Sequence, residues 1–198
     1  MALHWAGEGI WYTAGMGIAT KLNYTPEDLL SMPDRGRYEL IDGQLLERNV
    51  SSESSMVALI LNARLIAFVL ANKLGWMVQA DGGLQIFPDT PGKVRFGDGA
   101  FISKRRMPER PGAGHLRAAP ELVVEVVSPN DTAEEVDEKN EEYLRAGVLR
   151  VWVVYPATRS VTVIRPGGNE TRLTSADMLS GEDVLPGFEV PVADLFDF

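Results

Sequence analysis

The sequence predicts an α/β or α+β protein in which helices flank a mixed β-sheet. Residues Glu121–Val127 form a continuous apolar run closed by Ser128-Pro129, which is typical of a strand buried on both faces. A long apolar helical pattern follows Ser51, and further strand and helix patterns alternate after it. Together these observations indicate a sheet covered by helices.

The chain of 198 residues is long enough for one domain with a real core. We expect residues 23–198 to form that domain and residues 1–22 to form a flexible or partner-docking arm. The first residues lack the basic and apolar regions of a signal peptide. Hydrophobic residues make up 45% of the chain and charged residues 24%, which is ordinary for a soluble protein.

The absence of cysteine excludes disulfides, thiolate metal sites and cysteine nucleophiles, and it is compatible with the cytoplasmic location that we expect. The chain has only two histidines, so any metal would be a hard cation held by carboxylates. The net charge of −9 argues against a protein that coats nucleic acid non-specifically. It leaves room for an enzyme whose acidic site binds cations.

Two elements are predicted near the beginning of the domain. The segment Thr25–Asp28 begins a short helix, with threonine at the N-cap and proline in the first turn. Tyr38–Ile41 and Gln44–Glu47 form a hairpin around an Asp-Gly turn. Glu39 lies within this hairpin, where it is either a functional acid or a solvent-facing strand residue.

The next predicted element is a helix over Glu53–Lys73 whose apolar residues nearly encircle it. Asn62 and Arg64 interrupt an apolar run that is too short to span a bilayer comfortably. We therefore expect no membrane span. The helix is instead a core helix, or one that packs on the sheet and against a second subunit.

Strand patterns follow at Trp76–Gln79, Leu84–Phe87 and Val94–Ile102. Asp98 lies in the third of these between two glycines, which suggests a bulge or the close approach of a ligand. A simple turn aspartate is the alternative. The segment from 93 to 117 is rich in basic residues and predicts a phosphate-facing loop, with a solvated loop as the alternative. The candidate nucleic-acid contacts are Lys93, Arg95, Lys104, Arg105 and Arg106.

After the central strand, a helix is predicted to begin near Thr132 and to end at Ala146. Lys139 shares its apolar stripe, and either its amine enters a site or its stem packs while the amine reaches water. The strands predicted after this helix are Val151–Tyr155, Ser160–Arg165 and Thr171–Leu173. The C-terminal residues 192–198 are expected to form a tail with little regular structure.

A carboxylate in the middle of the central strand is the strongest functional signal. An ionised Glu125 is costly there unless it is paired, protonated or bound to a metal. It is either a core glutamate satisfied by an arginine or lysine, or a metal ligand paired with Asp98 on a neighbouring strand. Such carboxylates holding Mg²⁺ beside one amine, with Glu39 as a possible third acid and Lys139 as the amine, suit hydrolysis of a phosphodiester. We find no nucleotide-binding glycine loop and no GxSxG motif, and we expect no organic cofactor.

An ordered set of segments resembles the Uma-two family, a group of restriction-endonuclease-like proteins in the PD-(D/E)XK nuclease superfamily. The segments that carry this resemblance are Tyr38–Gly43, Val94–Asp98, Pro120–Pro129, Lys139, Tyr143, Ala146–Val148 and Trp152. The resemblance covers roughly Tyr24 to Phe196. It implies a mixed sheet flanked by helices, DNA cleavage dependent on Mg²⁺ or Mn²⁺, and often a homodimer. By position, Asp98 and Glu125 match the metal-binding acids, and Glu39 matches an early glutamate.

The chain departs from the family pattern at three places. Gly97 precedes Asp98 where the superfamily usually has proline, and Val127 stands where a strand lysine is expected. In similar proteins that lack it, the resemblance implies that a lysine on the following helix can take its place, and Lys139 is the matching candidate. The start of the long helix reads Glu53-Ser54-Ser55, where a histidine often occurs. These departures bear on turnover more than on metal binding.

The leading hypothesis is a divalent-metal-dependent DNA endonuclease. The alternative is a catalytically degenerate homodimeric module that binds nucleic acid or protein on the same fold. Hydrolysis of another phosphoester is a third possibility, because two carboxylates and a cation do not specify DNA. Only the resemblance indicates that the substrate is DNA.

Overall fold

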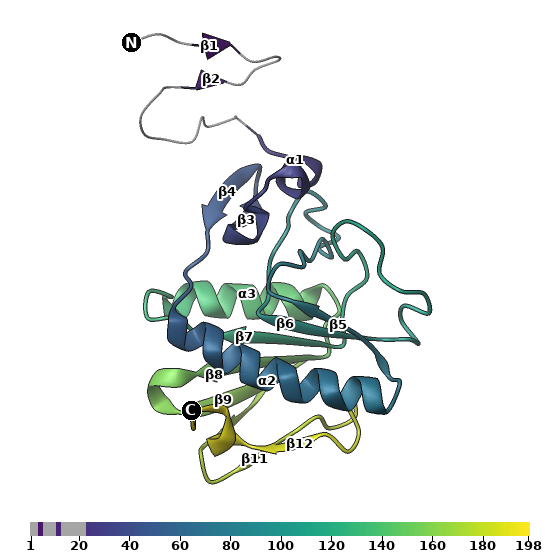
Figure 1. The fold of residues 1–198 in the computed structure, drawn as a ribbon, viewed down its shortest axis with the longest axis vertical. Helices are drawn as coiled ribbons and strands as arrows, with labels where there is room; N and C mark the ends of the chain where they lie inside the picture. Colours follow the sequence, from purple (N-terminus) through teal and green to yellow (C-terminus); the bar gives the residue numbers. More distant parts are fainter. Residues whose placement is uncertain (1–3, 6–10, 13–22) are drawn as a thin grey trace.

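A six-stranded mixed sheet forms the centre of the protein in a computed structural model that describes residues 4–5, 11–12 and 23–198 (Figure 1). The strand order is β10-β9-β8-β7-β6-β5, with β7 and β8 parallel and the other neighbours antiparallel. Helix α3 (Ala133–Arg145) provides the crossover that a parallel pair requires. The strands are β5 Gly75–Gln79, β6 Gly99–Ser103, β7 Leu122–Val126, β8 Arg150–Tyr155, β9 Ser160–Arg165 and β10 Asn169–Leu173.

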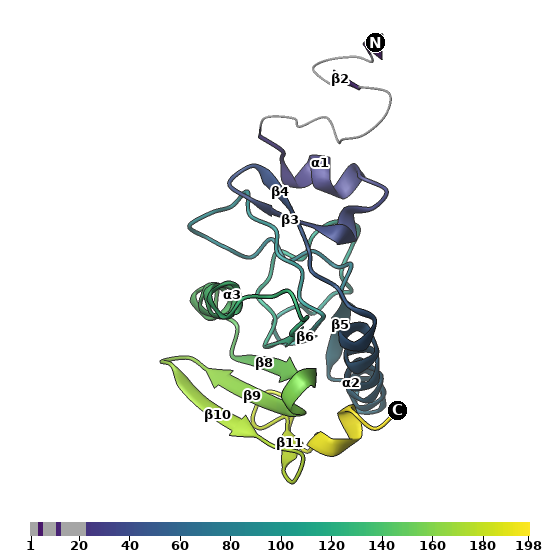
Figure 2. The same cartoon turned by 90° about the vertical axis from the view of Figure 1, so that its left-hand side faces the viewer.

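Both faces of this sheet are covered, as the apolar run of β7 predicts. Helix α2 (Ser52–Ala71) and the C-terminal segment pack on one face, and α3 packs on the other with the β5–β6 and β6–β7 loops (Figure 2). Alternate residues of β7 point to opposite faces, so Val124 joins the α2 side and Val123 joins the α3 side. The predicted mixed sheet flanked by helices is confirmed.

Helix α2 is a core helix with one exposed apolar face. Ser51 caps its first turn in a reciprocal pair of hydrogen bonds with Ser54. The helix is long and apolar enough to cross a membrane by length and composition. However, its inner side packs on the sheet through fully or almost fully buried residues, namely Val57, Leu61, Leu65 and Val69.

A smaller layer lies at one end of the sheet. Helix α1 (Pro26–Ser31) begins with the predicted Thr25 cap, and β3 (Tyr38–Ile41) pairs with β4 (Gln44–Glu47) in the predicted hairpin. Both residues of its Asp-Gly turn have positive φ, at 49° and 76°, as a two-residue hairpin turn requires. A two-way backbone pairing between Leu40 and Val94, at 2.9 Å in each direction, joins the hairpin to the rest of the fold.

One predicted strand is wrong and another is confirmed only over its second half. Leu84–Phe87 forms no ladder, and only Leu84 makes isolated bridges, to Arg95 and Leu116. The single strand expected over Val94–Ile102 is divided, because the Phe96 amide donates to the Glu39 carboxylate instead of joining the sheet. Residues 96–98 therefore leave the ladder, and β6 begins at Gly99.

The C-terminal end of the chain also differs from the expectation. The C-terminal region contains a strand pair, β11 (Met178–Ser180) with β12 (Glu189–Pro191), followed by a 3-10 turn over Val192–Leu195. This region has more structure than predicted because its apolar side chains complete the core on the α2 side. Near the N-terminus, β1 (His4–Trp5) pairs with β2 (Trp11–Tyr12). The rest of the predicted arm lies outside the described residues.

Shortening one buried side chain of α2 tests this packing. We expect Leu65→Ala to lower the free energy of unfolding by about 2–5 kcal/mol, because Leu65 is fully buried against the sheet. The matched control Leu46→Ala removes a leucine that is 47% exposed, and its cost should stay below about 1 kcal/mol. Chemical denaturation followed by circular dichroism measures both. Equal losses would contradict the assignment of α2 as a core helix.

Candidate active site

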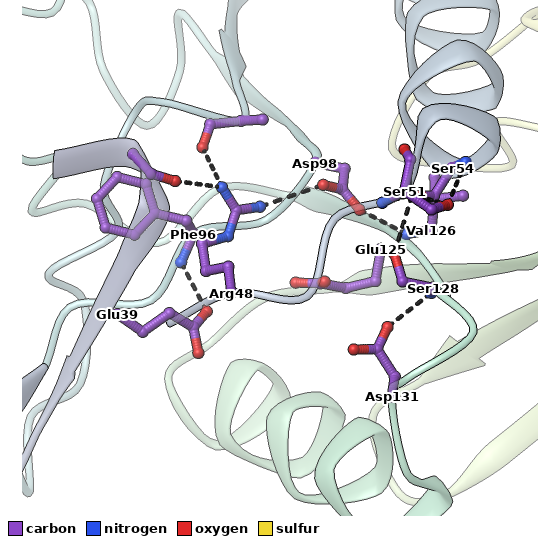
Figure 3. Close-up of polar contacts among 12 residues, drawn as sticks. Glu39, Arg48, Ser51, Ser54, Phe96, Asp98, Glu125, Val126, Ser128 and Asp131 are labelled. Carbon is purple, nitrogen blue, oxygen red and sulfur yellow. Dashed lines mark hydrogen bonds and ion pairs between the residues drawn. The ribbon is translucent and has the colours of Figure 1, made fainter. Parts of the chain in front are cut away.

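The four residues proposed from the sequence line one cavity of about 260 Å³ beside the hairpin, the sheet and α3. Figure 3 shows three of them, Glu39, Asp98 and Glu125. Glu39 comes from β3, Asp98 directly precedes β6, Glu125 lies in β7, and Lys139 lies in α3. These elements are far apart in the sequence, and the hairpin, the central sheet and α3 meet only in the folded protein. The structure therefore brings all four side chains to one place.

Asp98 is held by its backbone and by its carboxylate. Its amide donates to the Val124 carbonyl at 2.8 Å, and its Oδ2 accepts the Val126 amide at 2.7 Å. Burial raises the pKa of Asp98, while the Val126 amide and Arg48 oppose that rise. The carboxylate is thus fixed at the junction of β6 and β7.

Gly99, which follows Asp98, allows α2 to pack closely against the strand. A Cβ atom on Gly99 would lie 2.2 Å from Oδ1 of Asn62. The amide nitrogen of Asn62, from α2, donates to the Asp98 carbonyl at 2.8 Å. The close approach expected from the sequence is therefore that of α2 to the strand, and it helps to position Asp98.

Glu125 is satisfied by two donors from α3. Tyr143 donates its hydroxyl to Oε1 at 2.8 Å, and Lys139 donates to Oε2 at 3.0 Å. Burial raises the pKa of Glu125 to about 7, against the opposing charge of Lys139. Glu125 therefore changes its protonation state near neutral pH, which is a common property of active-site acids.

Lys139 bridges two carboxylates, because its Nζ also lies 3.3 Å from Oε1 of Glu39. Glu39 is only 6% exposed, and it accepts hydrogen bonds from Arg95 at 2.7 Å and from the Phe96 amide. Burial disfavours its ionised form, but Lys139 and Arg95 lower the pKa of Glu39 to about 2. Glu39 is therefore an internal ionised acid rather than a solvent-facing one, and Lys139 points into the site.

The basic loop expected from the sequence is only partly on the surface. Arg95 is buried between Glu39 and Glu142, and Lys93 also pairs with Glu142. These two cations neutralise acids inside the fold, so the structure corrects their expected role as phosphate contacts.

The other three basic residues are divided between the surface and a second internal contact. Arg106 donates to backbone carbonyls and lies 3.3 Å from the buried Glu121. Lys104 and Arg105 are exposed. They are the members of the predicted set that remain available to a partner.

Two residues of the site were not assigned from the sequence. Tyr143 follows Lys139 by one helical turn, and this spacing could have placed both on Glu125. Arg48 donates to Oδ1 of Asp98 at 3.2 Å, and no local pattern predicts a contact between residues so far apart in the chain. The Arg48 guanidinium also lies over the Phe96 ring, 5.6 Å from its centre.

The oxygen atoms that could bind a metal in this cavity suit a hard divalent cation. Asp98 and Glu125 offer carboxylate oxygens in one cavity, and Mg²⁺ in enzymes commonly uses one or two carboxylates with water and substrate phosphate. Within the described part of the chain, no group of three or more acidic or histidine side chains is arranged to hold a metal. The residues therefore fit a cation held by two carboxylates and completed by water or substrate.

Comparisons with known proteins agree with this fold. A crystal structure of a "putative nuclease belonging to DUF820" from Anabaena variabilis is similar, with a TM-score of 0.69 and 17% sequence identity. The match covers 87% of this chain and 97% of that one. No curated protein matches the chain. The model of the Uma2 (Uma-two) family, described as "Putative restriction endonuclease", matches residues 26–193. The chain therefore belongs to the Uma2 family of restriction-endonuclease-like proteins.

Proposed function

We propose that this protein is a divalent-metal-dependent endonuclease that hydrolyses phosphodiester bonds in DNA. The observation that carries the proposal is the convergence of Asp98, Glu125 and Lys139 in one cavity at the junction of β6, β7 and α3. Two acids and one amine are the groups that metal-assisted hydrolysis of a phosphodiester needs. Membership of the Uma2 family supports DNA as the substrate.

Each side chain has a distinct proposed role. Asp98 and Glu125 would hold Mg²⁺ or Mn²⁺, which when bound polarises the phosphate and lowers the pKa of water. Lys139 orients the attacking water or stabilises the negative charge that develops on the phosphate. Burial would lower the pKa of Lys139, but Glu125 and Glu39 raise it, so the amine stays protonated and acts as a cation. Its place on α3 supports a substitution for the lysine that is missing at Val127.

The alternative of a degenerate binding module has one observation in its favour. Every carboxylate oxygen of Asp98 and Glu125 already has a protein donor, namely Val126, Arg48, Tyr143 and Lys139. A fold that had lost its metal could keep its buried acids neutralised in this way. Lys104 and Arg105 are the proposed DNA contacts under either function, because both are exposed.

We further propose that the protein forms a homodimer through α2. The exposed face of this helix carries Met56, Leu59, Ile66 and Leu70, with the small residue Ala63 at its centre. These positions repeat with the alternating three- and four-residue spacing of a helix–helix seam. In an antiparallel pair centred on Ala63, Met56 of one copy would face Leu70 of the other, because both lie equally far from Ala63 along the helix.

Cleavage of supercoiled plasmid with Mg²⁺ or Mn²⁺ tests the enzyme. We expect Asp98→Ala and Glu125→Ala to abolish cleavage, and Lys139→Ala to reduce it on the order of 100-fold. Glu134→Gln, an exposed acid of α3, is the matched control and should cleave like the wild type. Cleavage that survives Lys139→Ala would keep the metal site and remove the role of the amine. A wild type that neither cleaves DNA nor binds Mn²⁺ would favour the binding module.

The pKa of Glu125 predicts a pH dependence of metal binding. Because this pKa is raised to about 7, the carboxyl is mostly protonated at pH 6 and mostly ionised at pH 8. Only the ionised form binds a cation well, so Mn²⁺ affinity should rise roughly tenfold over this range. Calorimetry at the two pH values measures it, with Glu125→Gln as the comparison. The same pH dependence in Glu125→Gln would show that another group titrates.

Introducing a charge on the exposed face of α2 tests whether this face forms the dimer interface. Leu59 is 67% exposed, so Leu59→Glu should leave the fold intact and convert a dimer to a monomer. Met178→Glu, at a residue that is 48% exposed on β11, is the matched control and should stay dimeric. Size-exclusion chromatography with light scattering gives the mass. A monomeric wild type would contradict the dimer.

A further inference from the structure

Arg48 is a fixed cation at the metal-binding acid. It directly follows β4, and its Nη1 donates to two backbone carbonyls, those of Gly36 and Ala80, at 2.9 Å each. Its Nη2 points to Oδ1 of Asp98 (Figure 3). The side chain is only 10% exposed and lies against Phe96. The two carbonyls hold the guanidinium in place whether or not Asp98 accepts its hydrogen bond, because its planar fork of donors binds them directly.

The buried acids at the cavity are paired with cations. Glu39, Asp98, Glu125 and Glu142 make ion pairs with Arg48, Lys93, Arg95 and Lys139. Four further acids line the cavity nearer to solvent, namely Glu47, Asp131, Glu135 and Glu138. A divalent cation that bound Asp98 without substrate would lie beside the fixed charge of Arg48. A phosphodiester that entered with it would bring a compensating negative charge.

We propose that Arg48 is a positioning residue that holds Asp98 when no metal is bound and weakens the binding of a divalent cation until a phosphodiester enters with it. The proposal rests on the proposed metal-dependent nuclease function. Arg48 acts in two ways: its Nη2 occupies an oxygen that the metal would use, and its fixed charge repels the metal. It therefore makes metal loading depend on the substrate.

Arg48 is held more rigidly than Lys139, the cation that pairs with Glu125 and Glu39. Lys139 has a flexible stem and a compact ammonium, so it can move between Glu125, Glu39 and a bound phosphate. Arg48 cannot follow a phosphate without losing its two carbonyl partners. Its effect is therefore a constant electrostatic cost to the metal, and removal of the charge should make the metal bind more tightly.

Calorimetric titration of Mn²⁺ into the full chain without DNA tests whether the charge of Arg48 weakens metal binding. Arg48→Gln removes the charge but keeps a donor for the carbonyls, and it should bind Mn²⁺ on the order of tenfold more tightly than the wild type. Arg48→Lys keeps the charge and should bind like the wild type. Arg64→Gln removes a cation that pairs with Asp194 on the surface, and it is the matched control with unchanged affinity. A merely structural role predicts weaker binding in both Arg48 variants.

A second measurement adds substrate, and its first arm uses the wild type, so that arm does not depend on the folding of a variant. A DNA duplex with non-hydrolysable phosphorothioate linkages should raise the Mn²⁺ affinity of the wild type by more than tenfold, and that of Arg48→Gln by less. Equal Mn²⁺ affinity with and without the duplex would overturn the role of Arg48 while leaving the nuclease intact. A wild type that binds neither Mn²⁺ nor the duplex would overturn the proposed function as well.

Discussion

The ion pair between Lys139 and Glu125 is the interaction on which the rest of the site depends. It joins α3 to the central strand, and through Glu39 it also joins both to the hairpin. Loss of one partner from a buried pair leaves an uncompensated charge and costs about 3–5 kcal/mol. The lysine amine is therefore a structural bridge between α3, the central strand and the hairpin.

The same elements that build the core also place the functional atoms. α2 covers one face of the sheet, and its Asn62 reaches the carbonyl of Asp98. α3 covers the other face, and its Lys139 and Tyr143 reach Glu125. The acids thus lie between two helices that are fixed by apolar packing. This arrangement keeps charged groups at set positions, including Asp98 at the end of the long β5–β6 connection.

Two sets of cations pair with the acids of the site, one in the cavity and one behind it. Lys139 neutralises two acids and can exchange partners, whereas Arg48 is held by backbone carbonyls and stays beside Asp98. Behind them, Arg95 and Glu142 connect Glu39 to a further internal pair. The buried acids of the site are therefore ion-paired, while Glu47, Asp131, Glu135 and Glu138 line the same cavity nearer to solvent.

The sequence by itself determined the local structure: the Thr25 cap, the Asp-Gly hairpin turn, the apolar strand around Glu125 and the face of α3 that carries Lys139. These features depend on neighbouring residues, so their patterns are readable along the chain. Only the tertiary structure decided that Arg48 contacts Asp98, that Arg95 is buried and that residues 96–98 leave the sheet. Each of these depends on a side chain from a distant element, and a charged residue shows no local sign of whether its partner is water or a buried acid.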